Sequence, residues 1–306
     1  MVSRERLLRL GATLADRATE RRVRVLAQLL LLGAIVFVVL RARSLWHGSH
    51  VELGRVDWLA LAGALVFAAA ATAAAGLIWL AILGSLGVRT QPSWAGIFFQ
   101  AQLGKYIPGS VWQYASRAAV ARRHGIPMRP VAVSLPIEFV GSAVAAGVTG
   151  AFLLGWWGAI VVAAVAALLL ALERLCRSRG PVVLTTIRSV LLYLPLELLL
   201  GGSFWLCARG LVGAPARDLA FYIGAFAVAW LAGLVAFYAP GGIGVREAVL
   251  VALLQSRIGS ADALVVAAVS RLVLIVTDVT FAGIGTVIMR ERGGPVPSTV
   301  PRRLRP

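Results

Sequence analysis

The chain has 306 residues, of which 59% are apolar and only 14% are charged, and its mean hydropathy is +0.86. A soluble domain carries about a quarter charged residues, so this composition excludes a soluble globular protein and indicates an all-α protein with several membrane-spanning helices. The formal charge of +17 could suggest nucleic-acid binding. Because the arginines lie at the ends of apolar runs, they instead indicate orientation in a bilayer and contact with anionic lipid headgroups, and no nucleic-acid partner is expected.

In chain order, residues 1–24 form a basic amphipathic lead that we expect at the cytoplasmic membrane surface. Residues 25–289 form the predicted membrane domain, and the Arg- and Pro-rich residues 290–306 form a tail that we expect to be disordered. Six apolar runs are predicted to span the bilayer: Val25–Leu40, Trp58–Leu83, Val131–Leu154, Ala159–Leu172, Val182–Leu206 and Ala263–Met289. A tight turn over Gly155-Trp156-Trp157-Gly158 is expected between the third and fourth of these.

The segment Trp94–His124 is too polar and too interrupted to be an ordinary spanning helix. Its centre reads Lys105-Tyr106-Ile107-Pro108-Gly109-Ser110. Proline cannot donate a backbone hydrogen bond and glycine leaves the backbone free to bend, so a helix is expected to stop here. The first half, Trp94–Ile107, would give about 21 Å of helix, which is too short to cross a core of about 30 Å. We therefore predict a re-entrant hairpin that returns to the side from which it entered.

A second break of the same pattern follows 132 residues later: Tyr238-Ala239-Pro240-Gly241-Gly242-Ile243 aligns with Tyr106-Ile107-Pro108-Gly109-Ser110-Val111. It lies between the apolar segments Leu219–Ala239 and Gly244–Gln255. Matching helix breaks in the two halves of a membrane protein indicate a transport site. Three predicted spans separate the breaks, so the two broken elements would have opposite orientations, as in an inverted repeat. In an alternative with eight spans, both flanking segments cross the bilayer fully.

The arginine distribution predicts the orientation. With both termini cytoplasmic, 20 arginines near the membrane ends lie inside and 6 lie outside. This asymmetry satisfies the positive-inside rule. It predicts a multi-pass protein with both termini cytoplasmic.

Ionisable side chains within the apolar segments are functional candidates, because each costs about 2.5–3.5 kcal/mol at a helix centre. Arg271 and Asp278 are seven positions apart, so they share a helix face without touching and each needs another partner. For Glu138, Arg188 and Glu197 the favoured interpretation is internal ion pairing that fixes helix register. The remaining candidates are Lys105, Arg246 and Glu247.

Each break is expected to leave a helix N-terminus with free N–H groups, at Ser110–Trp112 and at Gly242–Gly244. Such termini bind anions such as phosphate, so an anionic or aminoacylated lipid is the expected ligand. The alternative is a purely structural kink with glycines for close packing. The predicted substrate-binding set comprises Lys105, Tyr106, Pro108, Gly109, Ser110, Arg117, Tyr238, Pro240, Gly241, Gly242, Gly244, Arg246 and Glu247. The two cysteines and three histidines have no ligand spacing, so neither a metal nor another cofactor is expected.

The stretch Lys105–Ser110 with Arg117, together with Pro240–Gly244 and Glu247, resembles the lysylphosphatidylglycerol synthase transmembrane (flippase-like) family. The similarity covers roughly Val25 to Met289. Together with the preference for arginine over lysine, the resemblance indicates a bacterial inner (plasma) membrane. It implies movement of a lipid between leaflets and assigns importance to Pro108, Gly109, Arg117, Pro240, Gly241, Gly244 and Glu247. The two-part synthases of that family carry a soluble aminoacyl-transfer domain; this sequence stops at Pro306 without one, so lysyl transfer by this polypeptide is not expected.

The leading hypothesis is therefore a flippase or transporter for a phospholipid or polyprenyl-phosphate-type lipid. A membrane enzyme of lipid-linked aminoacyl or glycosyl transfer, with Glu138 or Glu247 as its base, is the second hypothesis. The third is an accessory subunit that binds a separate transferase. No metal-binding carboxylate pair, nucleophile–base spacing or nucleotide motif supports the enzyme.

Overall fold

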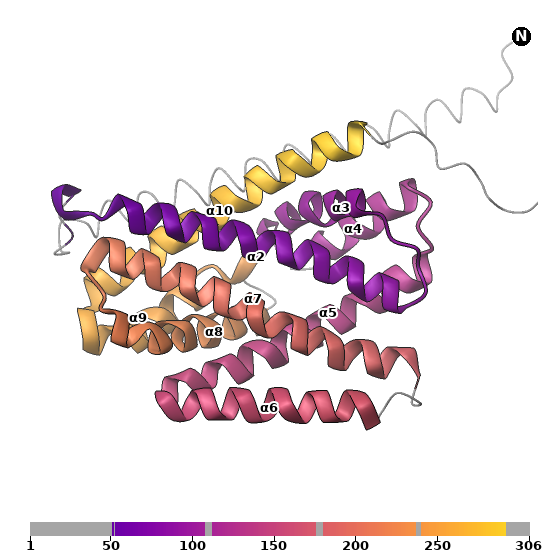
Figure 1. The fold of residues 1–306 in the computed structure, drawn as a ribbon. Helices are drawn as coiled ribbons and strands as arrows, with labels where there is room; N and C mark the ends of the chain where they lie inside the picture. The colour runs from indigo at the N-terminus through magenta and orange to yellow at the C-terminus, as the bar shows by residue number, and fades with distance from the viewer. Residues whose placement is uncertain (1–50, 52, 108–111, 176–179, 237–239, 292–306) are drawn as a thin grey trace, which may run out of the picture.

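The computed structural model describes residues 51, 53–107, 112–175, 180–236 and 240–291. Within these ranges the protein is all-α, with nine α-helices, short 3₁₀ segments and no strand (Figure 1). The helices are α2 (Trp58–Ser85), α3 (Ala95–Ala101), α4 (Trp112–Arg123), α5 (Met128–Thr149), α6 (Trp156–Leu175), α7 (Pro181–Val212), α8 (Leu219–Val235), α9 (Val245–Ile258) and α10 (Ser260–Glu291).

Six of the described helices are long and apolar enough to cross a membrane, so the chain is a membrane-embedded protein as its composition predicts. Five of them, α2, α5, α6, α7 and α10, correspond to predicted spans. The predicted span Val25–Leu40 and the lead 1–24 lie outside the described residues, as does the tail from residue 292; Arg290 and Glu291, expected in the tail, continue α10.

The sixth candidate is α8, which the sequence predicts as one arm of the second break. With its preceding 3₁₀ turn it covers Ala216–Val235, 20 residues and about 30 Å, enough to cross alone. Its partner α9 has 14 residues and is about 21 Å long, which is too short. The described α8 ends at Val235, before the predicted end at Ala239.

The bundle is built around α2 and α7, which lie side by side (Figure 1). The small residues Ala64 and Ala68 on α2 are fully buried, and Ser203 Oγ on α7 donates a 2.8 Å hydrogen bond to the carbonyl of Ala64. Lipid supplies no hydrophobic drive for helix association, so small residues that permit close contact stabilise such a pair. Nearer the N-terminus of α7, Ser189 Oγ donates to Ile137 O of α5 at 3.3 Å.

The 32-residue α10 connects the two broken elements. Its C-terminal part packs against α3 so closely that a Cβ on Gly96 would lie 2.9 Å from the carbonyl oxygen of Gly285. Its N-terminal part packs against α9, where Ala263 and Val266 share an apolar cluster with Leu254. The elements α3 and α4 therefore lie towards one end of the bundle, and α8 and α9 towards the other (Figure 1).

The predicted turn before α6 is shorter than expected. The left-handed Gly155, with φ of 68°, reverses the chain alone, and the helix begins at the next residue, Trp156. Trp157 is therefore a helical residue, and its side chain is exposed. This corrects the prediction that both tryptophans lie in the turn.

Both helix breaks occur where the sequence places them. Ile107 is extended (φ −86°, ψ 134°), as required of a residue that precedes proline, and the 3₁₀ segment η3 (Gln102–Tyr106) ends there. At the second break, the 3₁₀ segment η6 (Pro240–Gly242) contains Gly241 and Gly242 with φ of 54° and 70°. These left-handed conformations favour glycine and redirect the chain from α8 into α9.

Candidate functional site

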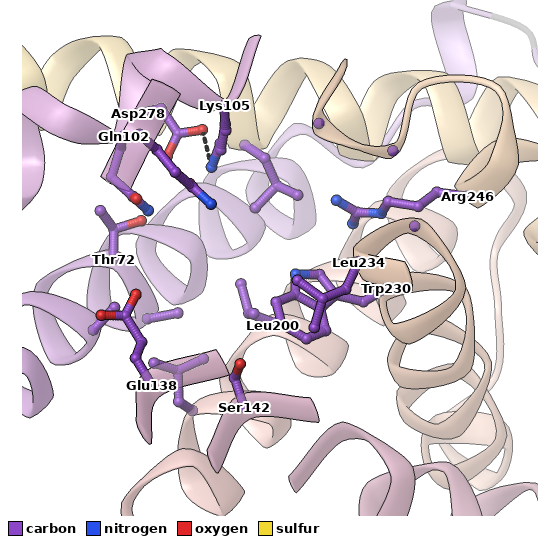
Figure 2. Close-up of a pocket in the computed structure, with 18 of the residues that line it drawn as sticks. Thr72, Gln102, Lys105, Glu138, Ser142, Leu200, Trp230, Leu234, Arg246 and Asp278 are labelled. Carbon is purple, nitrogen blue, oxygen red and sulfur yellow. Dashed lines mark ion pairs between the residues drawn. The ribbon is translucent and has the colours of Figure 1, made fainter. Parts of the chain in front are cut away.

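The two breaks meet at a cavity of about 240 Å³ inside the bundle (Figure 2). Residues of α2, α3, α4, α5, α7, α8, α9 and α10 complete its wall. Aromatic and aliphatic side chains form much of the lining, including Phe98, Leu200, Phe226 and Trp230. Its polar groups are Thr72, Gln102, Lys105, Tyr106, Gln113, Tyr114, Glu138, Ser142, Tyr193, Arg246, Arg271 and Asp278. An apolar enclosure with a few converging polar groups is typical of a ligand site.

Backbone contacts hold the breaks together. A Cβ on Gly241 would lie 3.4 Å from the carbonyl oxygen of Lys105 and 3.0 Å from Nη2 of Arg271, so only glycine fits between the first break and α10. Within the first break, a Cβ on Gly104 would lie 2.6 Å from the backbone nitrogen of Gln113. The two arms of the first break therefore touch just beside the cavity.

The first break is fastened to α10 through Asp278. The ammonium of Lys105 lies 2.7 Å from Asp278 Oδ2, and the Tyr106 hydroxyl donates a 2.6 Å hydrogen bond to the same oxygen. The side chain of Asp278 is almost fully buried, so these two donors compensate its lost hydration. Lys105 and Tyr106, which the sequence predicts as binding residues, thus line the cavity, but both are bonded to the carboxylate of Asp278.

The second break is fastened to α10 through Arg271. Its Nη2 donates a 2.7 Å hydrogen bond to the carbonyl of Gly241, and its Nη1 lies 3.5 Å from Glu247 Oε1. Arg271 and Asp278 therefore have separate partners, which confirms the prediction from their seven-residue spacing.

Glu247 occupies the start of α9, where Gly244 donates its backbone N–H to Glu247 Oε2 at 2.6 Å. The carboxylate of Glu247 stabilises the helix N-terminus by accepting a hydrogen bond from one of the backbone N–H groups that have no partner within the helix. In this structure an internal carboxylate accepts the hydrogen bond of the Gly244 amide, which the sequence assigns to the backbone around an external anion. Neither Gly244 nor Glu247 lines the cavity.

Arg117 is fully buried and bonded to Glu138, with both terminal nitrogens directed at the two carboxylate oxygens. Its guanidinium also stacks on Phe98, 4.3 Å from the ring centroid, and lies 5.4 Å from that of Trp79. Arg117 does not line the cavity, whereas Glu138 does. The positive charge of Arg117, a predicted site residue, is therefore neutralised by Glu138.

Arg246 differs from the other three cations. Its aliphatic stem packs on the backbone of Gly233 and Gly242, and its guanidinium lies 5.0 Å from the ring of Phe226. Within the described part of the chain, no carboxylate pairs with it and no acceptor binds it. Figure 2 shows its guanidinium pointing into the cavity, opposite the dashed Lys105–Asp278 pair.

The charges around the cavity therefore leave one cation in excess. The four cations are Lys105, Arg117, Arg246 and Arg271, and the three carboxylates that pair with cations are Glu138, Glu247 and Asp278. Because each carboxylate has its own partner, the excess is localised at Arg246. A site of this kind fits a singly charged anion.

The internal pairs expected of Glu138 and Arg188 are confirmed: Arg117 binds the first, and Arg188 Nε lies 2.9 Å from Glu173 Oε1 on α6. The same expectation for Glu197 is wrong. Glu197 is fully buried in α7, and neither of its carboxyl oxygens has a hydrogen-bond partner among the described residues.

Four predicted site residues, Pro108, Gly109, Ser110 and Tyr238, lie outside the described residues, and Pro240 begins η6. Sequence reasoning missed several lining residues. Three of them lie in the polar stretch around the first break: Gln102, Gln113 and Tyr114. Their closeness to the break in the sequence could have identified them as lining residues. Thr72 interrupts a run of alanines in α2. Nothing in the sequence distinguishes Tyr193 or Trp230 from the other aromatic residues.

Comparison with models of protein families, with curated proteins and with solved structures finds no match to this chain. In the described ranges, no three His, Cys, Asp or Glu side chains gather in a way that could hold a metal ion.

Proposed function

We propose that this protein is an integral membrane flippase that binds the anionic headgroup of a lipid and moves it between leaflets. The observation that carries the proposal is Arg246, an arginine with no partner among the described residues, directed into a cavity within a membrane-embedded bundle. The substrate class is a phospholipid, including an aminoacylated one, or a polyprenyl-phosphate-type lipid.

The energetics favour a phosphate-bearing ligand. An unpaired arginine inside a membrane protein is costly, and a phosphate relieves that cost by accepting two parallel N–H bonds from the guanidinium. The cavity, at about 240 Å³, lies below the range of about 300–1,000 Å³ typical of sites that enclose a whole drug-sized ligand. It suits a headgroup, and the acyl chains would stay in the surrounding lipid.

The arrangement of the breaks supports alternating access. The helices of the two broken elements, α3 and α4 on one side and α8 and α9 on the other, lie towards opposite ends of the bundle (Figure 1). They are separated along the chain by α5, α6 and α7, and their breaks meet at the cavity. This favours an inverted repeat in which two broken elements enter from opposite sides. In the eight-span alternative α8 crosses fully. We infer an inner-membrane location with cytoplasmic termini from the arginine distribution.

The test is leaflet exchange in liposomes that contain the purified full-length protein. Labelled phosphatidylglycerol, lysyl-phosphatidylglycerol and a polyprenyl phosphate are compared with labelled phosphatidylcholine, which has no net charge. We expect faster exchange of at least one of the first three lipids. Arg246→Gln should slow it by about ten- to a hundredfold, because a hydrogen bond to a charged group contributes about 1.5–3 kcal/mol.

The matched control is Arg188→Gln, the same substitution at a half-exposed arginine paired with Glu173 away from the cavity. It should leave exchange unchanged. Failure to accelerate any lipid of the panel would contradict the proposal. Product formation from a lipid-linked donor would then favour a membrane enzyme, and stable co-purification with a separate transferase would favour an accessory subunit.

A further inference from the structure

Glu197 is the charged side chain for which neither the fold nor the proposed function accounts. It lies on α7 one helical turn from Tyr193 and from Leu200, both of which line the cavity. Its side chain is completely inaccessible to solvent, and both carboxyl oxygens lack a hydrogen-bond partner among the described residues. An ionised carboxylate in such a place costs far more than a neutral carboxylic acid. The described arrangement is therefore that of the protonated acid.

The surroundings of Glu197 contain one cation that has no carboxylate partner among the described residues. The helices α2 and α8, which pack against α7, contain no charged residue. From α5, Glu138 faces Tyr193 but is bonded to Arg117 of α4. From α10, Asp278 and Arg271 face the cavity, paired with Lys105 and Glu247. The last group is Arg246 of α9, whose guanidinium lies 5.0 Å from the ring of Phe226 on α8, the helix that packs against α7.

Glu197 and Arg246 are thus two groups of opposite potential charge, and neither has an ion-pair or hydrogen-bond partner among the described residues. They do not form a salt bridge as described. The stem of Arg246 packs against Gly233 and Gly242, and its guanidinium lies at the end of that stem beside the ring of Phe226. If the guanidinium turned towards an ionised Glu197, it would leave the cavity and the site would lose its excess cation.

We propose that Glu197 is a proton-binding site, and that the cavity takes up one proton together with each anion. This inference rests on the proposed function and adds its ion coupling. In one state, ionised Glu197 pairs with Arg246 and the cavity is neutral and closed to anions. In the other, a proton converts the Glu197 carboxylate into a carboxylic acid, Arg246 turns into the cavity, and a lipid phosphate binds it. One positive and one negative charge enter together, so the exchange is electroneutral.

Thermodynamic linkage makes the coupling measurable. Because anion binding favours protonated Glu197, alkaline pH must weaken anion binding. Above the midpoint of Glu197 protonation, the affinity should fall by about tenfold for each pH unit. Binding in this range should take up about one proton per anion.

The experiment is isothermal titration calorimetry of the full-length protein in detergent, with short-chain phosphatidylglycerol as the probe. Titrations are made from about pH 5 to about pH 9, where an unperturbed Lys, Tyr or Arg does not titrate. Buffers of different ionisation enthalpy give the number of protons taken up. Short-chain phosphatidylcholine serves as the probe without net charge.

Glu197→Gln removes the titratable proton and keeps nearly the same shape, and Glu197→Leu removes the polar group altogether. Both should bind the probe with an affinity independent of pH and without proton uptake; the second keeps the test decisive if the first fails to fold. The matched control is Glu173→Gln on α6, which should behave as the wild type. Equal pH dependence in wild type, Glu197→Gln and Glu197→Leu would overturn the inference.

The outcomes separate this inference from the proposed function. Proton-coupled binding without leaflet exchange would refute transport and leave the proton site standing. Leaflet exchange whose pH dependence survives Glu197→Gln would refute the proton site and leave transport standing. Absence of both anion binding and exchange in the wild type would refute both.

Discussion

The first and second helix breaks share a sequence pattern but differ in how their cations are used. At the first break, Lys105 pairs with Asp278, and Arg117 pairs with Glu138. At the second, the carboxylate of Glu247 is shared between the N-terminus of α9 and Arg271, which leaves Arg246 alone. Two similar motifs therefore give one neutralised element and one element with a free positive charge.

This difference shows that a repeated motif fixes the bend of the backbone and not the chemistry beside it. Both breaks stop a helix through proline and glycine. Which cation remains available depends on partners elsewhere in the sequence: α5 and α10 supply the carboxylates that neutralise the first break, and Arg271 of α10 takes the carboxylate of the second. We infer that the first break stabilises the bundle and that the second supplies the ligand's counter-charge.

The most severe test of this contrast is Arg117→Gln. It would leave Glu138 without its cation, and breaking a buried pair in this way costs about 3–5 kcal/mol. We expect a large fall in the midpoint of thermal unfolding in detergent, and recovery of most of it when Glu138→Gln is added. A stable Arg117→Gln variant that has lost lipid exchange would instead place Arg117 in ligand binding and break the comparison.

Gly104→Ala tests whether the first break depends on its closed arms. The added Cβ would lie 2.6 Å from the backbone nitrogen of Gln113, so the arms must separate. We expect a loss of about 1–3 kcal/mol in the free energy of unfolding, typical of overpacking. Gly84→Ala is the control, because nothing lies within 4 Å of its added Cβ, and it should be neutral or stabilising. Equal stability of both variants would contradict the described contact.

A charge-balance experiment sharpens the contrast between Lys105 and Arg246. Lys105→Gln leaves Asp278 with the Tyr106 hydroxyl alone and lowers the positive charge at the cavity. We expect a roughly tenfold loss of leaflet exchange, corresponding to about 1.4 kcal/mol. Adding Asp278→Asn restores the charge balance and should restore exchange to within about threefold. If the double variant is no better than the single one, Lys105 binds the ligand directly.

The smallest effect is expected at the periphery. Arg188→Gln removes an arginine whose side chain is 43% exposed and whose partner is Glu173. Exposed ion pairs contribute about 0–1 kcal/mol, so the unfolding midpoint should change little. The difference between the unfolding midpoints of Arg188→Gln and Arg117→Gln measures how much burial increases the cost of replacing a paired arginine by glutamine. A cost as large as that of Arg117→Gln would show that burial is not the cause.

The sequence predicts the helices well because long apolar runs and helix breakers have local physical causes. The helix α2 begins at the predicted residue, Trp58, and α7 contains the whole predicted run Val182–Leu206. The extended Ile107 follows from the proline after it. The conformation of Gly155 sets the start of α6, and hydropathy alone does not reveal it.

Partners within the site are less predictable, because they join residues far apart in the chain. Tyr106 and Asp278 are 172 positions apart, and no local pattern links them. The spacing of Arg271 and Asp278 correctly predicts that they do not pair with each other, but it does not identify the partner of either residue. For Glu197, the general rule that buried charges are paired gives the wrong answer, and the departure from that rule marks a functional candidate.

Both broken elements are attached to one continuous helix, α10, through Arg271 and Asp278. Seven residues correspond to about 10.5 Å along a helix axis, so these anchors lie on one rigid rod. A rotation of α10 about its axis would loosen Tyr106 and Gly241 together. The two breaks are therefore mechanically coupled, because a displacement of α10 changes the contacts of both at once.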